Sequence, residues 1–367
     1  MIPLCIPEIK GNEWKYVKEC IDTNWVSSVG SYVNLFEEKF NEYVGSKNAV
    51  VTMNGTAAIQ LALMTLGIGE GDEVIVPSLT FISPINTIKY VGAEPVFVDV
   101  CRDTFVMDAE KIEAMITPKT KAIMPVHIYG HPVDMDRVME IAKKHNLYVI
   151  EDATESLGSK YSGKMAGTIG DIGCFSFNGN KLITTGAGGM FVTNNVEYGS
   201  RAKFLSTQTK VVTENKAFYH PEIGYNFRMP NLLAAFGVAQ LENVEEYLKT
   251  KRENAAYYNE LLCDVSGITL PVEKENVENC FWLYSILVED DYGVTRDELI
   301  TKLNEQKIEA RPFFMPIHDM PPYKDNKHGN LSVTKELYKR GINLPSSVGL
   351  KVEDIKIVCE LIKNSKK

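Results

Sequence analysis

Several features that would place a chain in an extracellular or membrane class are missing from this sequence. Its seven cysteines are an odd number and are scattered singly, with no CxxC pair. A disulfide framework usually shows an even number of cysteines, so this pattern indicates a reduced, cytoplasmic protein. No run of about 18 apolar residues occurs, and the N-terminus lacks a basic region followed by an apolar one. We therefore expect a chain that is neither exported nor inserted in a membrane.

An excess of positive charge is also missing. The formal net charge is -9 and the isoelectric point is near 5.4, which argues against a nucleic-acid partner. A local cradle could still bind a small anionic ligand. No GxGxxG follows the first expected strand, and there is no Walker loop, no internal repeat and no low-complexity tract.

A metal site receives little support from the sequence. His127 and His131 have the i,i+4 spacing that could place two ligands on one helix face. Gly130 and Pro132 would break such a helix, and no third ligand is close in sequence. We therefore interpret these histidines as loop residues and expect no metal.

The order of apolar runs predicts the fold. A chain of 367 residues, 44% of them hydrophobic, can form two domains at about 100–200 residues each. Short β-branched runs alternate with helical stretches, a pattern typical of a mostly parallel sheet covered on both faces. We expect seven strands at 48–53, 72–77, 94–99, 121–126, 147–152, 173–177 and 188–193, with helices between them at 55–67, 82–91 and 134–146.

A long amphipathic stretch at 229–260 predicts one helix that could join two domains. The pattern of expected helices and strands changes after it. Beyond it the pattern is α+β, with a strand at 281–289 and helices at 295–306 and 352–365. We therefore expect a large α/β domain over residues 1–250 and a smaller α+β domain over residues 251–367.

Polar residues that follow the strands are the candidate site, because ligands collect at the carboxyl ends of parallel strands. Asn54-Gly55-Thr56 could bind an anion through free N–H groups at a helix start, although a plain turn gives the same pattern. Glu151 and Asp152 end a buried strand, where a carboxylate needs a cationic partner unless it is an exposed terminus or a cap. Most lysines are solvated surface charges, and Lys181, in a Gly-containing turn, becomes a nucleophile only if its pKa is lowered.

A glycine-rich run at 184–190 indicates backbone that must pass close to another group. The order of these features is more informative than any one of them: a phosphate cradle, then an aspartate at a strand end, then a lysine beside Ser176. Pyridoxal phosphate needs a lysine for its aldehyde, an anionic partner for its ring nitrogen and donors for its phosphate. The sequence therefore predicts a pyridoxal-phosphate site.

Eight longer motifs run in order along nearly the whole chain: GNEWKYVKECIDTNWVSSVG (11–30), NGTAA (54–58), PSLTFISP (77–84), PVHIYG (125–130), EDATESLGSKY (151–161), FSFNGNKLITTGAGGM (175–190), GYNFRMPNLLAA (224–235) and RPFFMPIHDMPPY (311–323). Together they resemble the DegT/DnrJ/EryC1/StrS sugar aminotransferases, which have the fold-type I pyridoxal-phosphate architecture. The resemblance implies an aspartate aminotransferase-like fold.

The resemblance also implies roles for individual residues. Lys181 occupies the position of the Schiff-base lysine, and because relatives with histidine there dehydrate sugars, lysine favours transamination. Asp152 matches the partner of the pyridine nitrogen, and Glu155 stands where many members have glutamine near the ring hydroxyl. The resemblance also gives the remaining cofactor contacts: the phosphate donors Gly55, Thr56 and Ser176, the ring-stacking Phe81, and Asn226, a phosphate contact from the neighbouring subunit. Each of these residues could instead be an ordinary core or turn residue.

The implied assembly is a homodimer with shared active sites, and the implied substrates are a nucleotide-linked keto-sugar and L-glutamate. Three further residues, Arg228, Arg311 and His318, are either structural or contact the nucleotide-sugar. The N-terminal and C-terminal motifs, with INLPS at 342–346, are most similar to GDP-perosamine synthases, which aminate C4 of GDP-4-keto-6-deoxymannose.

Three alternatives remain open. The first is an aminotransferase acting on a UDP-linked 2-acetamido-4-keto sugar, of the bacillosamine or legionaminic acid type. The second is a non-catalytic regulator that keeps the cofactor pocket, although the chain has no evident basic DNA-binding helix. The third is an amino-acid desulfurase or decarboxylase of the same fold, which the PVHIYG and MPPY segments disfavour.

Overall fold

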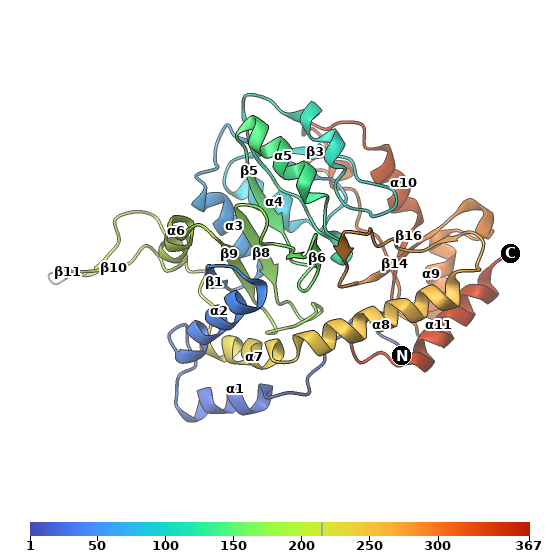
Figure 1. Ribbon diagram of the computed structural model, residues 1–367, viewed down its shortest axis with the longest axis horizontal. Coiled ribbons are helices and arrows are strands. Elements are labelled where there is room, and N and C mark those ends of the chain that lie inside the picture. Colours follow the sequence, from blue (N-terminus) through green and yellow to red (C-terminus); the bar gives the residue numbers. More distant parts are fainter. Residues whose placement is uncertain (214–215) are drawn as a thin grey trace.

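A seven-stranded sheet forms the centre of the computed structural model, which describes residues 1–213 and 216–367 (Figure 1). The strand order is β1-β9-β8-β5-β4-β2-β3, and every neighbouring pair is parallel except the two that involve β9. This confirms the expected mostly parallel sheet. The strands differ from the expected ranges only at their ends; they are β1 (Asn48–Thr52), β2 (Glu73–Pro77), β3 (Glu94–Val98), β4 (Thr120–Ile123), β5 (Tyr148–Asp152), β8 (Ile172–Ser176) and β9 (Gly189–Thr193).

Helices pack against this sheet and bury both of its faces. Successive side chains of a strand point to opposite faces, and two hydrophobic clusters follow that alternation. Val50 and Cys174 belong to one cluster, whereas their neighbours Val51 and Phe175 belong to the other. The helices of this part are α1 (Glu13–Asp22), α2 (Ser31–Val44), α3 (Gly55–Thr65), α4 (Ser83–Tyr90), α5 (Met135–His145), α6 (Val196–Ser206) and α7 (Asn231–Leu241).

Local signals explain where two of these helices begin. The side chain of Asn54 accepts a hydrogen bond from the N–H of Ala57 and caps α3. Asp134 caps α5 in the same way by accepting from the N–H of Arg137, and α5 ends at Asn146 in the left-handed conformation. α3 starts directly after β1, and α5 starts after the loop that follows β4. The start of α3 therefore lies at the edge of the sheet where β1 ends.

The single helix expected over 229–260 is wrong, because the segment forms α7 and then α8 (Val244–Leu262) with a break at Glu242 and Asn243. The side-chain amide of Asn243 donates to the carbonyl of Ala239, while its main-chain N–H bonds to Gln240 instead. A side chain that takes the i−4 acceptor competes with the helical ladder. α7 thereby stays packed between α1 and α2 while α8 leads to the C-terminal part (Figure 1).

The C-terminal part has a small antiparallel sheet of order β12-β14-β16-β15 with helices around it. Its strands are β12 (Ile268–Thr269), β14 (Tyr284–Val288), β15 (Arg311–Pro312) and β16 (Gly341–Leu344), and its helices are α9 (Arg296–Glu305), α10 (Ser332–Arg340) and α11 (Val352–Ser365). A third hydrophobic cluster fills the space between this sheet, α8, α9 and α11. The expected division at 250/251 falls inside α8 and remains a prediction.

Two small strand groups lie outside these sheets. β6 (Lys160–Tyr161) pairs with β7 (Lys164–Met165) and with β13 (Val277–Glu278), which connects the central and C-terminal parts. β10 (Val211–Thr213) and β11 (Lys216–Tyr219) form a hairpin that extends away from the rest of the molecule (Figure 1). Among the described residues, none of the helices has the length and apolar character needed to cross a bilayer.

Candidate active site

A cavity of about 380 Å³ opens at the carboxyl ends of the parallel strands. It receives residues from the ends of β5 and β8, from the start of α3, and from the loop that follows β2. Eight of the residues expected in the site line it: Gly55, Thr56, Phe81, Asp152, Glu155, Ser176, Lys181 and Arg311. Residues far apart in the sequence thus meet where open α/β sheets bind their ligands.

Lys181 presents its amine to this cavity from the turn after β8. The turn is closed by the N–H of Lys181, which donates to the carbonyl of Asn178. The side chain is 13% exposed, and Nζ lies 3.5 Å from Oε1 of Glu155. On another side Nζ is 3.8 Å from the ring centroid of Trp282. The lysine is therefore held inside the cavity rather than solvated on the surface.

Two buried carboxyl groups accompany this amine. Burial raises the pKa of Asp152 and of Glu155, while the nearby Lys181 cation works in the opposite direction. Oδ1 of Asp152 accepts from the N–H of Thr154 at 3.0 Å, and Oε2 of Glu155 accepts from the N–H of Tyr129 at 2.9 Å. A buried carboxylate beside a cavity fits a cationic N–H group of a ligand, such as a protonated pyridine nitrogen.

The start of α3 forms a narrow cradle with β8. A Cβ built on Gly55 would lie 2.8 Å from Cβ of Ser176, so only glycine fits between the two elements. A Cβ on Gly189 would lie 2.5 Å from the main chain of Asn54, which identifies what the glycine-rich run at 184–190 passes close to. The hydroxyl of Thr56 lies 2.8 Å from that of Ser83 at the start of α4. Helix-start N–H groups beside hydroxyls fit a phosphate.

Aromatic side chains form one wall of the cavity. Phe81 is 51% exposed, an unusual state for phenylalanine, and lies edge-on to Phe314 with ring centroids 5.7 Å apart. Phe314 in turn stacks on Tyr129 at 5.7 Å. A ring that is supported on one side and open on the other is suited to contact a flat heterocycle.

Three of the expected site residues do not line this cavity. Oδ1 of Asn226 accepts from Nε of Arg228, and Arg228 borders a different hollow near the start of α2. Nδ1 of His318 lies 2.7 Å from the hydroxyl of Ser78, and its ring is buried. The chain's own cavity is thus lined without these three residues.

The two histidines considered as metal ligands are buried in the loop after β4. Val133 donates its N–H to Nδ1 of His127, so Nε2 carries the proton and donates to Glu151 at 3.0 Å. Burial lowers the pKa of His131 to about 4. Within residues 1–213 and 216–367, no group of three or more His, Cys, Asp or Glu side chains is arranged to hold a metal.

Sequence reasoning missed several residues that line the cavity. Trp282 lies just before β14 and Asn343 lies in β16, both in the C-terminal part, and the buried hydroxyl of Thr80 bonds to none of the described residues. Trp282 was expected only as part of a strand, and nothing local distinguishes it from a core residue. The INLPS motif did include Asn343, but only as a subgroup signature.

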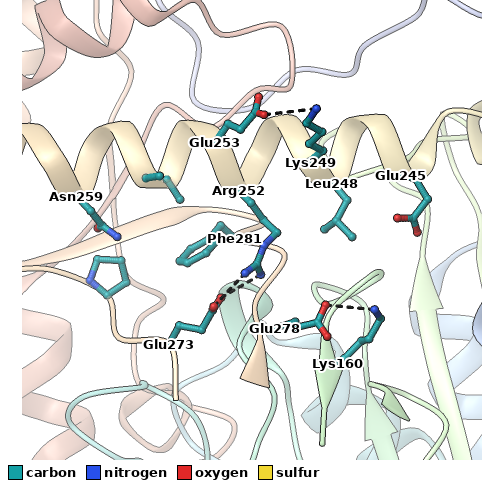
Figure 2. Close-up of a pocket in the computed structure, with 13 residues that line it drawn as sticks. Lys160, Glu245, Leu248, Lys249, Arg252, Glu253, Asn259, Glu273, Glu278 and Phe281 are labelled. Carbon is teal, nitrogen blue, oxygen red and sulfur yellow. Dashed lines mark hydrogen bonds and ion pairs between the residues drawn. The ribbon is translucent and has the colours of Figure 1, made fainter. Parts of the chain in front are cut away.

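A larger hollow of about 600 Å³ lies elsewhere, along α8 (Figure 2). Its labelled cations are each paired with a carboxylate: Arg252 with Glu273, Lys160 with Glu278, and Lys249 with Glu253. Such paired surface charges are a solvated face. The smaller cavity around Lys181, with its largely enclosed amine and two buried carboxyls, is therefore the candidate active site.

Comparison with known proteins agrees with this geometry. Residues 7–363 match the DegT/DnrJ/EryC1/StrS aminotransferase family. The chain is 45% identical to the GDP-perosamine synthase of Caulobacter vibrioides, over 96% of this chain and 95% of that protein. It is 46% identical to the GDP-perosamine synthase of Escherichia coli O157:H7, over 98% and 97%.

A solved structure extends the likeness to three dimensions. The PLP form of Spr1654 from Streptococcus pneumoniae superposes with a TM-score of 0.92 at 27% identity, covering 99% of this chain and 98% of that one. The match in sequence and in fold spans nearly every residue, and it includes the strand that ends at Asp152 and the turn that carries Lys181. The chain belongs to the DegT/DnrJ/EryC1/StrS aminotransferase family.

Proposed function

We propose that the chain converts GDP-4-keto-6-deoxymannose to GDP-perosamine, with pyridoxal phosphate as cofactor and L-glutamate as amino donor. The observation that carries the chemistry is the largely enclosed Lys181 amine in one cavity with Asp152 and a helix-start cradle. The choice of sugar is supported by the identity of about 45% to two GDP-perosamine synthases over nearly their whole length.

The residues present fit the cofactor. Lys181 would hold its aldehyde, Asp152 its ring nitrogen and Glu155 its ring hydroxyl. Gly55, Thr56 and Ser176 would bind the phosphate, and the open face of Phe81 would contact the ring. When bound, the cofactor supplies an electron sink for the charge that develops on the carbon losing a proton.

Lys181 has two tasks in this proposal. Besides holding the cofactor, its released amine takes a proton from the donor carbon and later returns a proton to C4 of the sugar. Asp152 keeps a negative charge beside the ring nitrogen throughout. The Lys181 side chain is 13% exposed, so contact of the amine with water, which would exchange the proton, is limited.

Substrate contacts differ in the support they receive. Arg311 borders the cavity, with its guanidinium bonded to Glu309, and could pair with a phosphate or carboxylate. The hydrogen bond between His318 and Ser78 favours a structural role for His318. Asn226 and Arg228 lie outside their own chain's cavity, which supports a homodimer in which each site takes residues from both chains.

Two other functions are less well supported. An aminotransferase for UDP-linked 2-acetamido-4-keto sugars would use the same cavity, but the two relatives above are named for a GDP-linked product. A non-catalytic regulator would have no need for the buried Lys181 beside Asp152. We place the enzyme in the cytoplasm, where nucleotide-linked sugars are made.

The deciding experiment offers the purified protein GDP-linked and UDP-linked 4-keto-6-deoxy sugars with glutamate and identifies the product by mass. We expect an amino sugar from the GDP substrate and 2-oxoglutarate in equal amount. Lys181→Ala is the control and should give neither product. An amino product from the UDP-linked sugar alone would contradict the proposed substrate, and turnover by Lys181→Ala would contradict the role of Lys181.

A further inference from the structure

Trp282 places the face of its indole ring against the amine of Lys181. The residue lies two positions before the first residue of the C-terminal strand β14 and is 4% exposed. Nζ of Lys181 lies 3.8 Å from the centroid of its ring, well inside the range of a cation–π contact. A residue of the C-terminal part therefore touches the group on which the chemistry depends.

The orientation of this ring is fixed by contacts on several sides. Its Nε1–H donates to the carbonyl of Asn180 at 2.7 Å, which ties the ring to the residue before Lys181. The main-chain carbonyl of Trp282 accepts from the buried amine of Lys251 at 2.7 Å, which holds the backbone at this position. Tyr129 stacks on the ring with centroids 6.4 Å apart. The ring cannot turn away from Lys181 without losing its contacts with Asn180 and Tyr129.

A carboxylate approaches the same amine. Oε1 of Glu155 lies 3.5 Å from Nζ, and Glu155 is itself held by the N–H of Tyr129. A buried ammonium is costly unless it has partners, and here a carboxylate and an aromatic face both favour the charged form. The two groups bound a small space that fits a lysine ammonium.

We propose that Trp282 is a positioning residue for Lys181 and forms, with Glu155, a cage that receives the lysine amine whenever it is not bonded to the cofactor. The idea rests on the proposed function, in which Lys181 is released and carries a proton. The lone pair of the released amine takes the proton of the donor carbon, and the resulting ammonium would be held between ring and carboxylate until it gives that proton up within the same half-reaction. In the half-reaction with the sugar the amine would again take up a proton, and the ammonium would be held in the same place until it returns a proton to C4.

The first test uses Trp282 itself as the reporter. The chain has three tryptophans, so Trp14→Phe with Trp25→Phe leaves Trp282 as the only one. We expect its fluorescence in the cofactor-free protein to change with pH as Lys181 loses its proton. Adding Lys181→Met should abolish that transition, and Glu155→Gln should move its midpoint down by about one pH unit. A titration that is identical with and without Lys181→Met would overturn the cage.

The second test measures Lys181 directly. Cofactor-free protein is exposed briefly to limiting pyridoxal phosphate and then borohydride at a series of pH values, and the labelled Lys181 peptide is quantified by mass. We expect Trp282→Leu to lower the midpoint of labelling by about half to one pH unit, with Trp282→Phe in between. An unchanged midpoint in both variants would overturn the role of the ring.

Neither test involves a sugar or turnover, so the two proposals can fail separately. If the chain shows both pH effects but aminates no nucleotide-sugar, the proposed function fails and the cage stands. If the chain makes the amino sugar but Trp282 does not report on Lys181, the cage fails and the function stands.

Discussion

At the scale of single residues, the chemistry depends on charges kept away from water. Asp152 is 2% exposed and its pKa is raised by burial, so its charged form depends on a cationic partner in the cavity. A protonated ring nitrogen would be that partner. The amide of an Asp152→Asn variant keeps the shape of the side chain but removes the charge.

We expect Asp152→Asn to bind some cofactor yet to lose about a hundredfold or more of the rate of the half-reaction with glutamate. Stopped-flow absorbance of the bound cofactor measures this rate in a single turnover. Asp171→Asn is the matched control, since Asp171 is also a carboxylate whose pKa burial raises, but it accepts from the N–H of Val149 outside the cavity. Equal rates for Asp152→Asn and the parent would contradict the role.

Residues of the site differ in how visible they are in the sequence. Asp152 and Lys181 follow apolar runs that predict strands. Because the carboxyl ends of parallel strands lie at the same edge of a sheet, their place at that edge could be predicted. No sequence pattern identifies Trp282 as a site residue, because its contact with Lys181 depends on how the C-terminal part packs against the central sheet. Contacts of that kind are decided by tertiary packing, which no local pattern encodes.

At the scale of elements, α8 is joined to the C-terminal part through a buried lysine. Lys251 is 3% exposed, and its amine donates to the carbonyls of Trp282 and Ser346, which flank β14 and β16. Burial lowers the pKa of this amine below its usual value of 10.5. The unfolded chain therefore binds the proton more tightly than the folded one does.

This predicts a pH dependence of stability that Lys251→Met removes. Between the lowered folded pKa and 10.5 the unfolded state holds more protons, so the contribution of Lys251 to the free energy of unfolding rises with pH. Urea unfolding at pH 7.5, 8.5 and 9.5 should show the parent gaining stability relative to Lys251→Met. Lys249→Met, at an exposed position of the same helix, should follow the parent. Parallel curves for parent and Lys251→Met would contradict the prediction.

The break between α7 and α8 shows why element boundaries are hard to predict. The apolar pattern continues from 229 to 260, and no proline or glycine marks the end of α7 at Leu241. The interruption comes from one side-chain hydrogen bond, between Asn243 and Ala239, that competes with the main-chain ladder. The central strands were easier to predict, because each is a short buried run bounded by polar residues.

At the scale of the whole molecule, the positions of Asn226 and Arg228 outside their own cavity lead to a test of shared sites. If Asn226 reaches the cofactor phosphate of a partner chain, Lys181→Ala and Asn226→Ala should each be inactive alone. When the two are mixed and exchange subunits, one site of each heterodimer carries both defects and the other is intact. We expect activity to recover toward about a quarter of that of the parent for equal mixing, given this symmetry.

Two measurements make the mixing experiment decisive. Asn226→Ala must be clearly impaired by itself, and exchange of subunits must be demonstrated with differently tagged chains. Mixtures that exchange but stay inactive would place Asn226 in its own chain's site or outside any site. Mixed Lys181→Ala and Asp152→Asn chains serve as the control. Both residues line the cavity of their own chain, so each site of the heterodimer carries one of the two defects and neither site is intact.

The small sheet has a consequence for how the enzyme is made. β14 and β15 both pair with β16, which ends at Leu344, so β14, which begins just after Trp282, has only the short β12 as a neighbour until β16 has been made. The half of the cavity that contains Lys181 is synthesised long before. A nascent or truncated chain that lacks β16 can thus form the lysine turn without the packed ring that covers it, which ties completion of the active site to synthesis of β16.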